Sequence, residues 1–478
     1  MNSKIKIPHV GVIIVTWNKK KDILHLLGQI QTINYPSEKL EIVVVDNCSS
    51  DGTPAAIESS YPDITLIKHL ENRGGSGGFN AGMRWALQNR PQCDYLWLLD
   101  NDVIVDKNAL TELVSVMEKN PQAAICGSKI MNRDNHDEMI EVGAFIDYQR
   151  GDIRRNMPPD VMLRNSEAVF EVDYVAACSL VVRSHLINKT GLWQERLFIY
   201  WDDMEWGARF NADGYKVLAS NASIVYHPSW ATRASDNSAV WRCYYRSRNS
   251  LWFFNNYTSG IKRRFLLTYM IARFQMHALS VCLRSESAFS GAFTNGIRDF
   301  FSGNYGKKDF RMPQNDIFKY LDNPQNRNIC IFVQDSDTTA PEKTFILRLM
   351  ERYADIRVSV IVPASDKHKW TDITDKIMTF TRIQKGAISL SNKGRIMKFL
   401  YTTSWNVLFT PPLVPRMGAL WGRDVARIDF QTGTAISIER IPFRHLFRTV
   451  MLALPLLLRV FMFPPSKTTG AADLHKNA

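Results

Sequence analysis

The chain has 478 residues, more than one compact core normally holds, so two or three domains are expected. A composition of 45% hydrophobic and 22% charged residues is that of a globular protein. The net charge of +12 favours an anionic partner, and no recognition motif for DNA or RNA accompanies it. The seven cysteines form no CxxC pair, which predicts a reduced, intracellular protein without structural zinc.

No segment of the sequence predicts export or a membrane span. Residues 1–8 are polar and lead directly into an apolar strand, so we expect no signal peptide. No stretch reaches about 18 uninterrupted apolar residues, which argues against a transmembrane helix.

The first 230 residues alternate apolar strands with helices. Apolar and helical spacing predicts strands at residues 10–16, 42–45, 64–68 and 95–99, and helices at residues 22–32, 53–60 and about 79–88. Strands of this kind, separated by helices, indicate a mostly parallel sheet covered on both faces. Such sheets bind ligands at the carboxyl ends of their strands, where Thr16, Asn18 and Asp46 lie in this sequence.

Beyond this predicted first domain, residues 1–235, three further regions are expected. Residues 236–320 have helical spacing and many basic and aromatic side chains, which predicts a helical extension. Strands near residues 328–333, 357–362, 377–381 and 407–409 predict a smaller accessory α/β domain, residues 321–440. In the tail, residues 441–478, the basic and apolar run 443–463 is expected to lie in a membrane interface or, alternatively, to dock on the accessory domain.

Two acidic residues directly after the fourth strand predict a metal site. Asp100 and Asp102 flank Asn101, and carboxylates two residues apart past a strand end can reach one divalent ion. Their hard oxygen ligands suit Mg²⁺ or Mn²⁺, which bridge the phosphates of substrates. Acids at strand ends also occur as plain turn residues, which is the alternative interpretation.

The segment after the third strand is rich in glycine. Residues 72–80 read NRGGSGGFN, and glycines before a helix let the backbone approach an anionic ligand closely. A flexible loop without a ligand is the alternative. Asp46, after the second strand, is suited to accept hydrogen bonds from a nucleobase or ribose, or else it forms a turn in which Ser50 or Asp51 caps the next helix.

Acids and aromatics gather again around residue 203. Asp202, Asp203 and Glu205 stand beside Trp201, and apolar surroundings raise the pKa of a carboxyl group, as a general base requires. Acids at the start of a helix also have a purely structural explanation. His227 follows a strand-like run and can act as a third metal ligand, although a lone histidine is more often structural.

In this order and spacing, the segments together resemble the family 2 glycosyltransferases, inverting enzymes with the GT-A fold. The resemblance covers about the first 250 residues and rests on seven segments: VTWN (15–18), VVVDNCSSDGT (43–53), NRGGSGGFNAG (72–82), LLDNDV (98–103), WDDMEWGARF (201–210), YHPSW (226–230) and WRCYYRSRN (241–249). The segments at residues 72–82, 201–210 and 226–230 look most like those of bacterial galactofuranosyltransferases. Polymer rhamnosyltransferases share much of the pattern. The galactofuranan polymerases carry an N-terminal β-domain, which we do not expect here.

The resemblance implies a role for each matching residue. It implies Asp203 as the catalytic base, and a Mn²⁺ or Mg²⁺ ion held by Asp100, Asp102 and His227. The donor nucleotide would contact Thr16, Asn18, Asp46, Arg73, Asp100 and Asn101. The acceptor would contact Trp201, Asp202, Glu205 and Trp230.

The expected reaction is transfer of galactofuranose from UDP-galactofuranose to a lipid-linked or polysaccharide glycan in bacterial cell-surface polysaccharide biosynthesis. Two alternatives stay open: rhamnosyl transfer from dTDP-rhamnose, and a non-catalytic sugar-nucleotide-binding assembly subunit. The expected location is cytoplasmic, peripheral on the inner face of the cell membrane. No nucleic-acid partner is expected, and oligomerisation is left open.

Overall fold

The computed structural model describes residues 7–165, 167–228, 238–283, 287–310, 317–333, 339–380, 396, 398, 407–410, 424–429, 434–439 and 462. These residues fall into two compact units: one within Met1–Met270, Gly296–Asp309 and Val460–Ala478, and one within Ile271–Asn295 and Phe310–Arg459. Among the described residues, no helix is both long and apolar enough to cross a bilayer.

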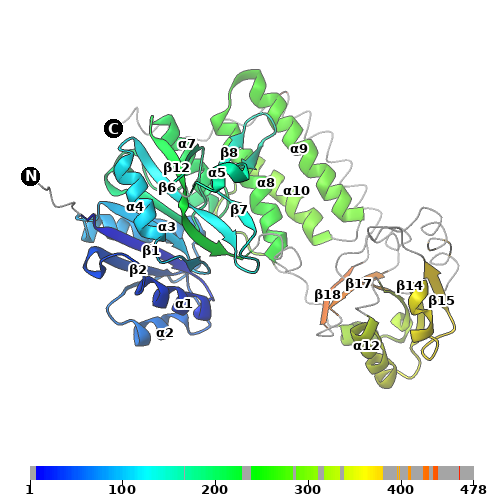
Figure 1. The fold of residues 1–478 in the computed structure, drawn as a ribbon. Helices are drawn as coiled ribbons and strands as arrows, with labels where there is room; N and C mark the ends of the chain where they lie inside the picture. The colour runs from blue at the N-terminus through cyan, green and yellow to red at the C-terminus, as the bar shows by residue number, and fades with distance from the viewer. Residues whose placement is uncertain are drawn as a thin grey trace, which may run out of the picture. The chain divides into compact units, whose positions relative to one another are not determined.

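The first unit is built on a mixed, mostly parallel sheet (Figure 1). Its main path runs β10-β12-β6-β11-β4-β1-β2-β3, with β5 paired to β12 and β7 paired to β6. The strands are β1 Val10–Thr16, β2 Leu40–Asp46, β3 Thr65–Lys68, β4 Tyr95–Asp100, β5 Ile104–Val105, β6 Ala123–Asn132, β7 Met139–Glu141, β10 Val169–Val172, β11 Ser179–Arg183 and β12 Lys216–His227. A separate hairpin pairs β8 Ala144–Asp147 with β9 Asp152–Arg155. The predicted α/β fold with a mostly parallel sheet is therefore confirmed.

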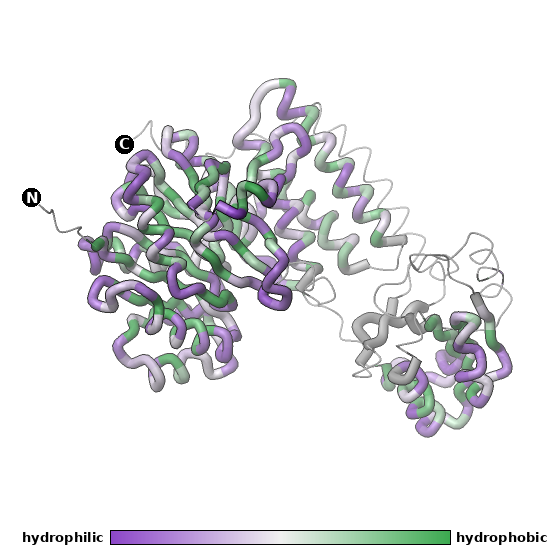
Figure 2. Tube along the Cα trace, in the orientation of Figure 1, coloured by the Kyte–Doolittle hydropathy of each residue, from purple (hydrophilic) through white to green (hydrophobic). Residues whose placement is uncertain are grey.

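Helices cover both faces of this sheet, because side chains of a strand alternate between its faces. Val12 and Ile14 of β1 pack with α1 (Lys20–Ile30), α2 (Thr53–Ser60) and α4 (Ala109–Lys119). Ile13 packs on the other face with α3 (Gly74–Asn89), α6 (Ser184–Thr190) and α7 (Asp202–Ala212). Hydrophobic residues accordingly follow the strands, while hydrophilic residues line many of the outer turns (Figure 2).

The glycine-rich segment is not a loop, and the prediction of a helix starting near residue 79 was wrong at this end. The helix α3 already begins at Gly74, so most of the glycines lie inside its first turns. Their function is close packing. A Cβ atom on Gly78 would lie 2.5 Å from Val15 Cγ1, and one on Gly82 would lie 2.3 Å from Ile13 Cγ2. The missing side chains let α3 sit directly on β1.

A helical region and a second sheet follow, as predicted. After the short α5 (Asp160–Leu163) and the strand β12, the long helices are α8 Ser238–Tyr257, α9 Gly260–Leu283 and α10 Ser287–Ser302. The second unit contains α11 Ile317–Leu321, α12 Thr339–Arg352, β13 Asn328–Phe332, β14 Arg357–Pro363, β15 Ile377–Phe380, β16 Val407–Thr410, β17 Asp424–Asp429 and β18 Thr434–Glu439. Its sheet has the order β15-β14-β13-β16-β17-β18 and is parallel except at β18. The last two strands were not predicted, and the tail run 443–463 falls almost entirely outside the described residues.

Candidate active site

Three potential metal ligands from distant parts of the sequence meet at the carboxyl ends of two strands. Asp100 is the last residue of β4, Asp102 follows two residues later, and His227 ends β12. One ligand atom from each lies within 4.8 Å of the others. Asp102 and His227 are buried, and Asp100 is half-buried. The parallel directions of β4 and β12 bring these three side chains to one edge of the sheet.

The histidine ring is oriented for ligation through one nitrogen. His227 Nδ1 lies 2.7 Å from the carbonyl oxygen of Pro228, which can only accept a hydrogen bond, so Nδ1 carries the proton. The other nitrogen, Nε2, lies 3.5 Å from Asp102 Oδ1. Two carboxylates and a neutral imidazole fixed by a backbone carbonyl form a donor set that suits Mn²⁺ or Mg²⁺.

Two adjacent residues connect this cluster to the predicted base. The amide of Asp100 donates to the carbonyl of Cys178 at 3.3 Å, and the amide of Ala177 donates to Asp203 Oδ2 at 3.4 Å. Burial raises the pKa of the Cys178 thiol, and the charges of Asp100 and Asp203 raise it further. The metal cluster and Asp203 therefore lie on either side of the segment that leads into β11.

Asp203 lies in the first turn of α7 and is half-buried. Burial raises its pKa well above the ordinary value of an aspartate, and the neighbouring charge of Asp202 raises it further. Asp202 points elsewhere: its Oδ2 accepts a 2.7 Å hydrogen bond from the Ser76 hydroxyl in a buried contact. The two adjacent acids thus have different surroundings, and Asp202 connects α7 to the start of α3.

Glu141, at the end of β7, is a further buried carboxylate that the sequence did not single out. It is 1% exposed, and burial raises its pKa to about 7, although Arg155 Nε at 3.5 Å lowers it in part. Its charge is among the causes of the raised pKa of Asp203, so it lies near the predicted base. No sequence motif marks this residue. It lies in a strand of three residues, β7, which is positioned by its pairing with β6 and gives little pattern of its own in the sequence.

Two predicted acceptor contacts are deeply buried. Glu205 is fully buried, accepts a 2.7 Å hydrogen bond from Tyr257, and pairs with Arg209 at 2.9 Å. Trp201 is 4% exposed and packs against Phe253 of α8. Both contacts stabilise the junction of α7 and α8. Trp230, the other aromatic acceptor contact that was predicted, lies outside the described residues.

The backbone before α7 is held in an unusual conformation. Phe198, Tyr200 and Trp201 have φ angles of 67°, 66° and 68°, which non-glycine residues rarely adopt. The Asn249 amide, from α8, donates to the carbonyl of Tyr200 at 2.9 Å and to two other carbonyls of this segment. Strained backbone of this kind persists only where its surroundings enforce it, and it occurs often at functional sites. Arg248 assists by donating to the Leu197 carbonyl at 3.0 Å.

The predicted nucleotide contacts lie at the ends of β1, β2 and β4. The Asn101 amide donates to Thr16 Oγ1 at 2.8 Å, and exposed Asn18 accepts from the amide of Ser50 at 2.7 Å. Asp46 is 2% exposed, and its Oδ2 accepts from the amide of Ser49. Within the described part of the chain, its Oδ1 has no hydrogen-bond partner, which is costly for a buried carboxylate oxygen. A ligand that donates a hydrogen bond would satisfy it.

Arg73 precedes α3 and is exposed. Its guanidinium forms a 3.0 Å salt bridge with Glu195, and Arg84 pairs with the same carboxylate at 2.6 Å. Burial raises the pKa of Glu195, but the hydrogen bonds and charges of its partners, chiefly Arg84, outweigh burial. The net result is a lowered pKa. Arg73 thus already has an acidic partner.

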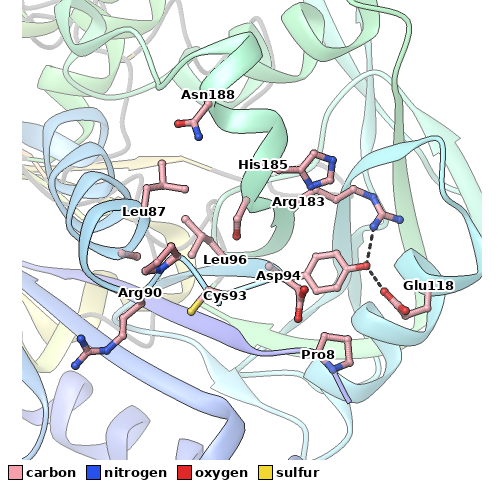
Figure 3. A pocket seen from close by; sticks show the side chains of 14 residues that line it. Pro8, Leu87, Arg90, Cys93, Asp94, Leu96, Glu118, Arg183, His185 and Asn188 are labelled. Carbon is pink, nitrogen blue, oxygen red and sulfur yellow. Dashed lines mark hydrogen bonds between the residues drawn. The ribbon is translucent and has the colours of Figure 1, made fainter. Parts of the chain in front are cut away.

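A cavity of about 420 Å³ lies elsewhere in the same unit (Figure 3). Pro8 and Tyr95 place it at the amino ends of β1 and β4, opposite the metal cluster. Arg183, in its wall, donates to Tyr95 and to the backbone carbonyls at the end of α4, and so acts as a structural cap. The cavity is therefore separate from the candidate active site.

Comparison with known proteins finds a family match over part of the chain. The model of glycosyl transferase family 2 matches residues 11–188. Galactofuranosyltransferase GlfT2 of Mycolicibacterium smegmatis is 22% identical over 267 residues, 51% of this chain and 40% of that protein. N-acetylglucosaminyl-diphospho-decaprenol L-rhamnosyltransferase of Mycobacterium tuberculosis is 22% identical over 236 residues, 44% of this chain and 73% of that protein. The chain thus spans less than half the length of its GlfT2 relatives.

Solved structures show weaker likenesses. Mannosyltransferase PcManGT from Pyrobaculum calidifontis, in complex with GDP-Man and Mn²⁺, is 17% identical with a TM-score of 0.40, over 62% of this chain and 88% of that one. The TarS 1-349 structure from S. aureus is 16% identical with a TM-score of 0.41, over 62% of this chain and 81% of that one. The strands that carry Asp46, Asp100 and Asp102 lie within the segment that the family model matches, so the match supports the resemblance for residues 11–188.

Proposed function

We propose that this chain is an inverting, metal-dependent glycosyltransferase that moves galactofuranose from UDP-galactofuranose to a glycan acceptor. The observation that carries the proposal is the meeting of Asp100, Asp102 and His227 within 4.8 Å, with Asp203 connected to them through residues 177 and 178. A metal-ligand cluster beside a half-buried carboxylate of raised pKa is an arrangement that can support sugar transfer from a nucleoside diphosphate.

The nucleotide of the donor would bind along the strand ends. The buried Asp46 Oδ1 has no partner in the described part of the chain and is suited to accept a hydrogen bond from the base or the ribose. Arg73 can contact the diphosphate if it exchanges its exposed salt bridge with Glu195 for the ligand, because an exposed ion pair contributes little stability.

Asp100, Asp102 and His227 would hold Mn²⁺ or Mg²⁺, and a bound ion would neutralise the charge that develops on the leaving diphosphate. Asp203 accepts the proton of the acceptor hydroxyl while that oxygen attacks the anomeric carbon of the donor. Asp202, bonded to Ser76, fixes the first turn of α7 and so directs Asp203. Inversion follows from this single displacement.

The donor sugar is the finer part of the proposal. Galactofuranose is favoured by the resemblance of the residue 72–82, 201–205 and 226–230 segments and by the likeness to GlfT2. Rhamnose from dTDP-rhamnose is the second candidate, and the similarity to a rhamnosyltransferase over 236 residues supports it. A non-catalytic binding subunit would not need both a metal-ligand cluster and Asp203.

We further propose that the enzyme works on a lipid-linked or polysaccharide acceptor at the inner face of the cell membrane, in cell-surface polysaccharide biosynthesis. The relative whose printed name includes a decaprenol-linked acceptor supports the acceptor class. The net charge of +12 supports attraction to an anionic surface.

A panel of nucleotide sugars tests the proposal. The protein is incubated with Mn²⁺ and each donor, with and without oligosaccharide acceptors, and the released nucleoside diphosphate is measured. We expect UDP-galactofuranose to be consumed fastest, and we expect EDTA to stop the reaction. Consumption of dTDP-rhamnose alone would change the proposed donor to dTDP-rhamnose and leave the proposed type of reaction unchanged. If no donor is consumed and Asp203→Asn behaves like the wild type, the enzymatic proposal is wrong.

A further inference from the structure

The first three turns of α9, within the first unit, carry an exposed apolar stripe. Ile261, Phe265 and Tyr269 are 57%, 60% and 47% exposed. They stand four residues apart, so at about 100° per residue they share one side of the helix. On the same geometry, exposed Lys262 lies about 20° beyond Tyr269, and exposed Arg264 lies about 60° before Ile261. A cation therefore borders the stripe on each side.

The opposite side of these turns is held by the protein. Leu266 is 6% exposed, and Leu267 and Met270 are fully buried. The stripe is thus the outer face of a helix that is already fixed on its inner face. Scattered exposed apolar side chains are common and need no explanation, but a row of three along one face is a larger exposed patch. Hydrophobic and hydrophilic residues alternate along this helix, as the stripe and its flanks require (Figure 2).

The surrounding sequence is strongly cationic. Residues 237–285 contain no aspartate or glutamate and contain eight basic residues: Arg242, Arg246, Arg248, Lys262, Arg263, Arg264, Arg273 and Arg284. In the part of the chain that the structure describes, neither Lys262 nor Arg264 forms a salt bridge. Both charges are therefore available to an anionic partner.

Charge distinguishes between three possible partners of this face: a second copy of the chain, the tail run 443–463, and an anionic lipid surface. A second copy of this chain would bring the same cations together, which is unfavourable. The tail run 443–463 contains Arg444, Arg448 and Arg459 and no acidic residue, so it is repelled for the same reason. An anionic lipid surface satisfies both features, because phosphate headgroups pair with the cations while the apolar side chains enter the headgroup–acyl boundary.

We infer that the outer face of α9, defined by Ile261, Lys262, Arg264, Phe265 and Tyr269, binds the surface of an anionic bilayer. The helix lies in the plane of the interface and does not cross the membrane, in keeping with the absence of a spanning helix among the described residues. This inference rests on the proposed membrane location and names the element that produces it. It places the anchor in the helical region that follows the transferase domain.

Vesicle flotation of the full chain tests the inference. Wild-type protein should float with vesicles of phosphatidylcholine and phosphatidylglycerol, and much less with vesicles of phosphatidylcholine alone. Lys262→Glu combined with Arg264→Glu should weaken binding at least roughly 30-fold, because each cation near an anionic surface contributes about fivefold. Phe265→Ser combined with Tyr269→Ser should weaken binding and leave the residual attraction more sensitive to salt.

Matched controls separate this face from general effects. Lys21→Glu combined with Lys107→Glu changes the net charge equally at exposed sites on other elements, and Val161→Ser removes another exposed apolar side chain; both should bind like the wild type. Arg448→Glu combined with Arg459→Glu tests the tail. Wild-type binding by the α9 variants, or loss of binding in the tail variant alone, would overturn the inference, as would failure of the wild-type protein to bind anionic vesicles.

Donor consumption with a water-soluble acceptor is measured on the same variants. The α9 variants should retain the wild-type rate, since none of the substituted residues belongs to the candidate active site. Loss of vesicle binding with full donor consumption supports the inference. Absence of donor consumption in wild-type protein that still binds vesicles through α9 would reject the proposed function and leave the inference standing.

Discussion

At the scale of single residues, the site depends on a few buried polar atoms whose partners come from distant segments. Asp102 and His227 are separated by 125 positions in the numbering and by 3.5 Å between Oδ1 and Nε2. A carboxylate and an imidazole at this distance interact strongly. A divalent cation bound by both would offset the free-energy cost of burying the carboxylate. The residue-scale predictions concern this cluster and the neighbouring base.

The first prediction is that Asp102→Ala or His227→Ala nearly abolishes transfer and leaves the fold intact. Each substitution removes a proposed metal ligand from the cluster near the ends of β4 and β12. The measurements are the transfer rate, the heat of Mn²⁺ binding, and circular dichroism. His185→Ala, on the wall of the separate cavity, should behave like the wild type. Full transfer in EDTA would show that the cluster does not serve a metal-dependent reaction.

The second prediction is that Asp203→Asn lowers the transfer rate by on the order of 10²–10⁴ with almost unchanged UDP affinity. Asparagine keeps the shape of the side chain but cannot accept the proton. Asp202→Asn and Glu205→Gln are the comparisons, since their carboxylates are bonded to Ser76 and to Arg209 and Tyr257. Retention of more than about a tenth of the rate by Asp203→Asn, with loss in a neighbour, would reassign the base.

The third prediction concerns pH. Burial, and then the charge of Asp202, raise the pKa of Asp203, so the proton-accepting form appears only above the range of an ordinary aspartate near about 3.9. The value of kcat/KM should therefore rise with pH through this raised pKa and then level off. Glu141 is ionised above its raised pKa of about 7, so Glu141→Gln removes a negative charge there and should move the upper part of the rise to lower pH. An unchanged profile in Glu141→Gln would mean that the two carboxylates do not interact.

At the scale of elements, the contact of α3 with β1 brings the start of α3 to the active site. This contact depends on glycine at positions 78 and 82, where Val15 and Ile13 occupy the space of a Cβ atom. The same helix supplies Ser76, which bonds Asp202, and its first turn is bonded to the strained segment before α7. Packing between elements thereby controls the position of Asp203, the proposed base.

The fourth prediction is that Gly82→Ala destabilises the first unit by about 1–3 kcal/mol, because Ile13 and Val45 are β-branched strand residues that cannot easily move away. Gly291→Ala is the matched control: it also replaces a helical glycine, but nothing lies within 4 Å of the added Cβ. The control should be neutral or stabilising by up to about 1 kcal/mol. Denaturant midpoints measure both, and equal effects would contradict the packing argument.

At the scale of the whole molecule, two compact units have separate hydrophobic cores. The sheet of the first unit is covered by buried residues on both faces, and the second unit has its own cluster around Ile331, Val360 and Trp370. All described candidate site residues lie in the first unit. The predicted domain boundaries remain predictions, because the helices that follow residue 260 contribute to both units.

The fifth prediction follows from this division. Thermal unfolding should show two transitions, and UDP with Mn²⁺ should raise the midpoint of one of them. A ligand at about a hundred times its dissociation constant stabilises the state that binds it by about 2.7 kcal/mol, and the other unit gains nothing. Scanning calorimetry with and without ligand measures both midpoints. Equal shifts of both transitions would show that the units unfold as one.

The sequence by itself determined the first four strands of the first unit and the polar residues at their ends. Local apolar runs and turn residues specify these features, so β1, β2, β3 and β4 were predicted within two residues. The association of Asp100 and Asp102 followed from their spacing, and their pairing with His227 followed from the family resemblance. Four of the five parallel strands of the second sheet, β13 to β16, were predicted for the same local reason.

Only the tertiary structure decided how the remaining residues are used. The glycines of residues 74–78 suggested a loop by composition, but they form the first turns of α3, where Gly78 packs against Val15 of β1. The sequence predicted that Glu205 contacts the acceptor, but its carboxylate is already bonded to Arg209 and Tyr257. Glu141 and Asn249 had no local sequence pattern that pointed to their roles. Their roles depend on neighbours far away in the sequence, since burial and hydrogen-bond partners are properties of the packed molecule.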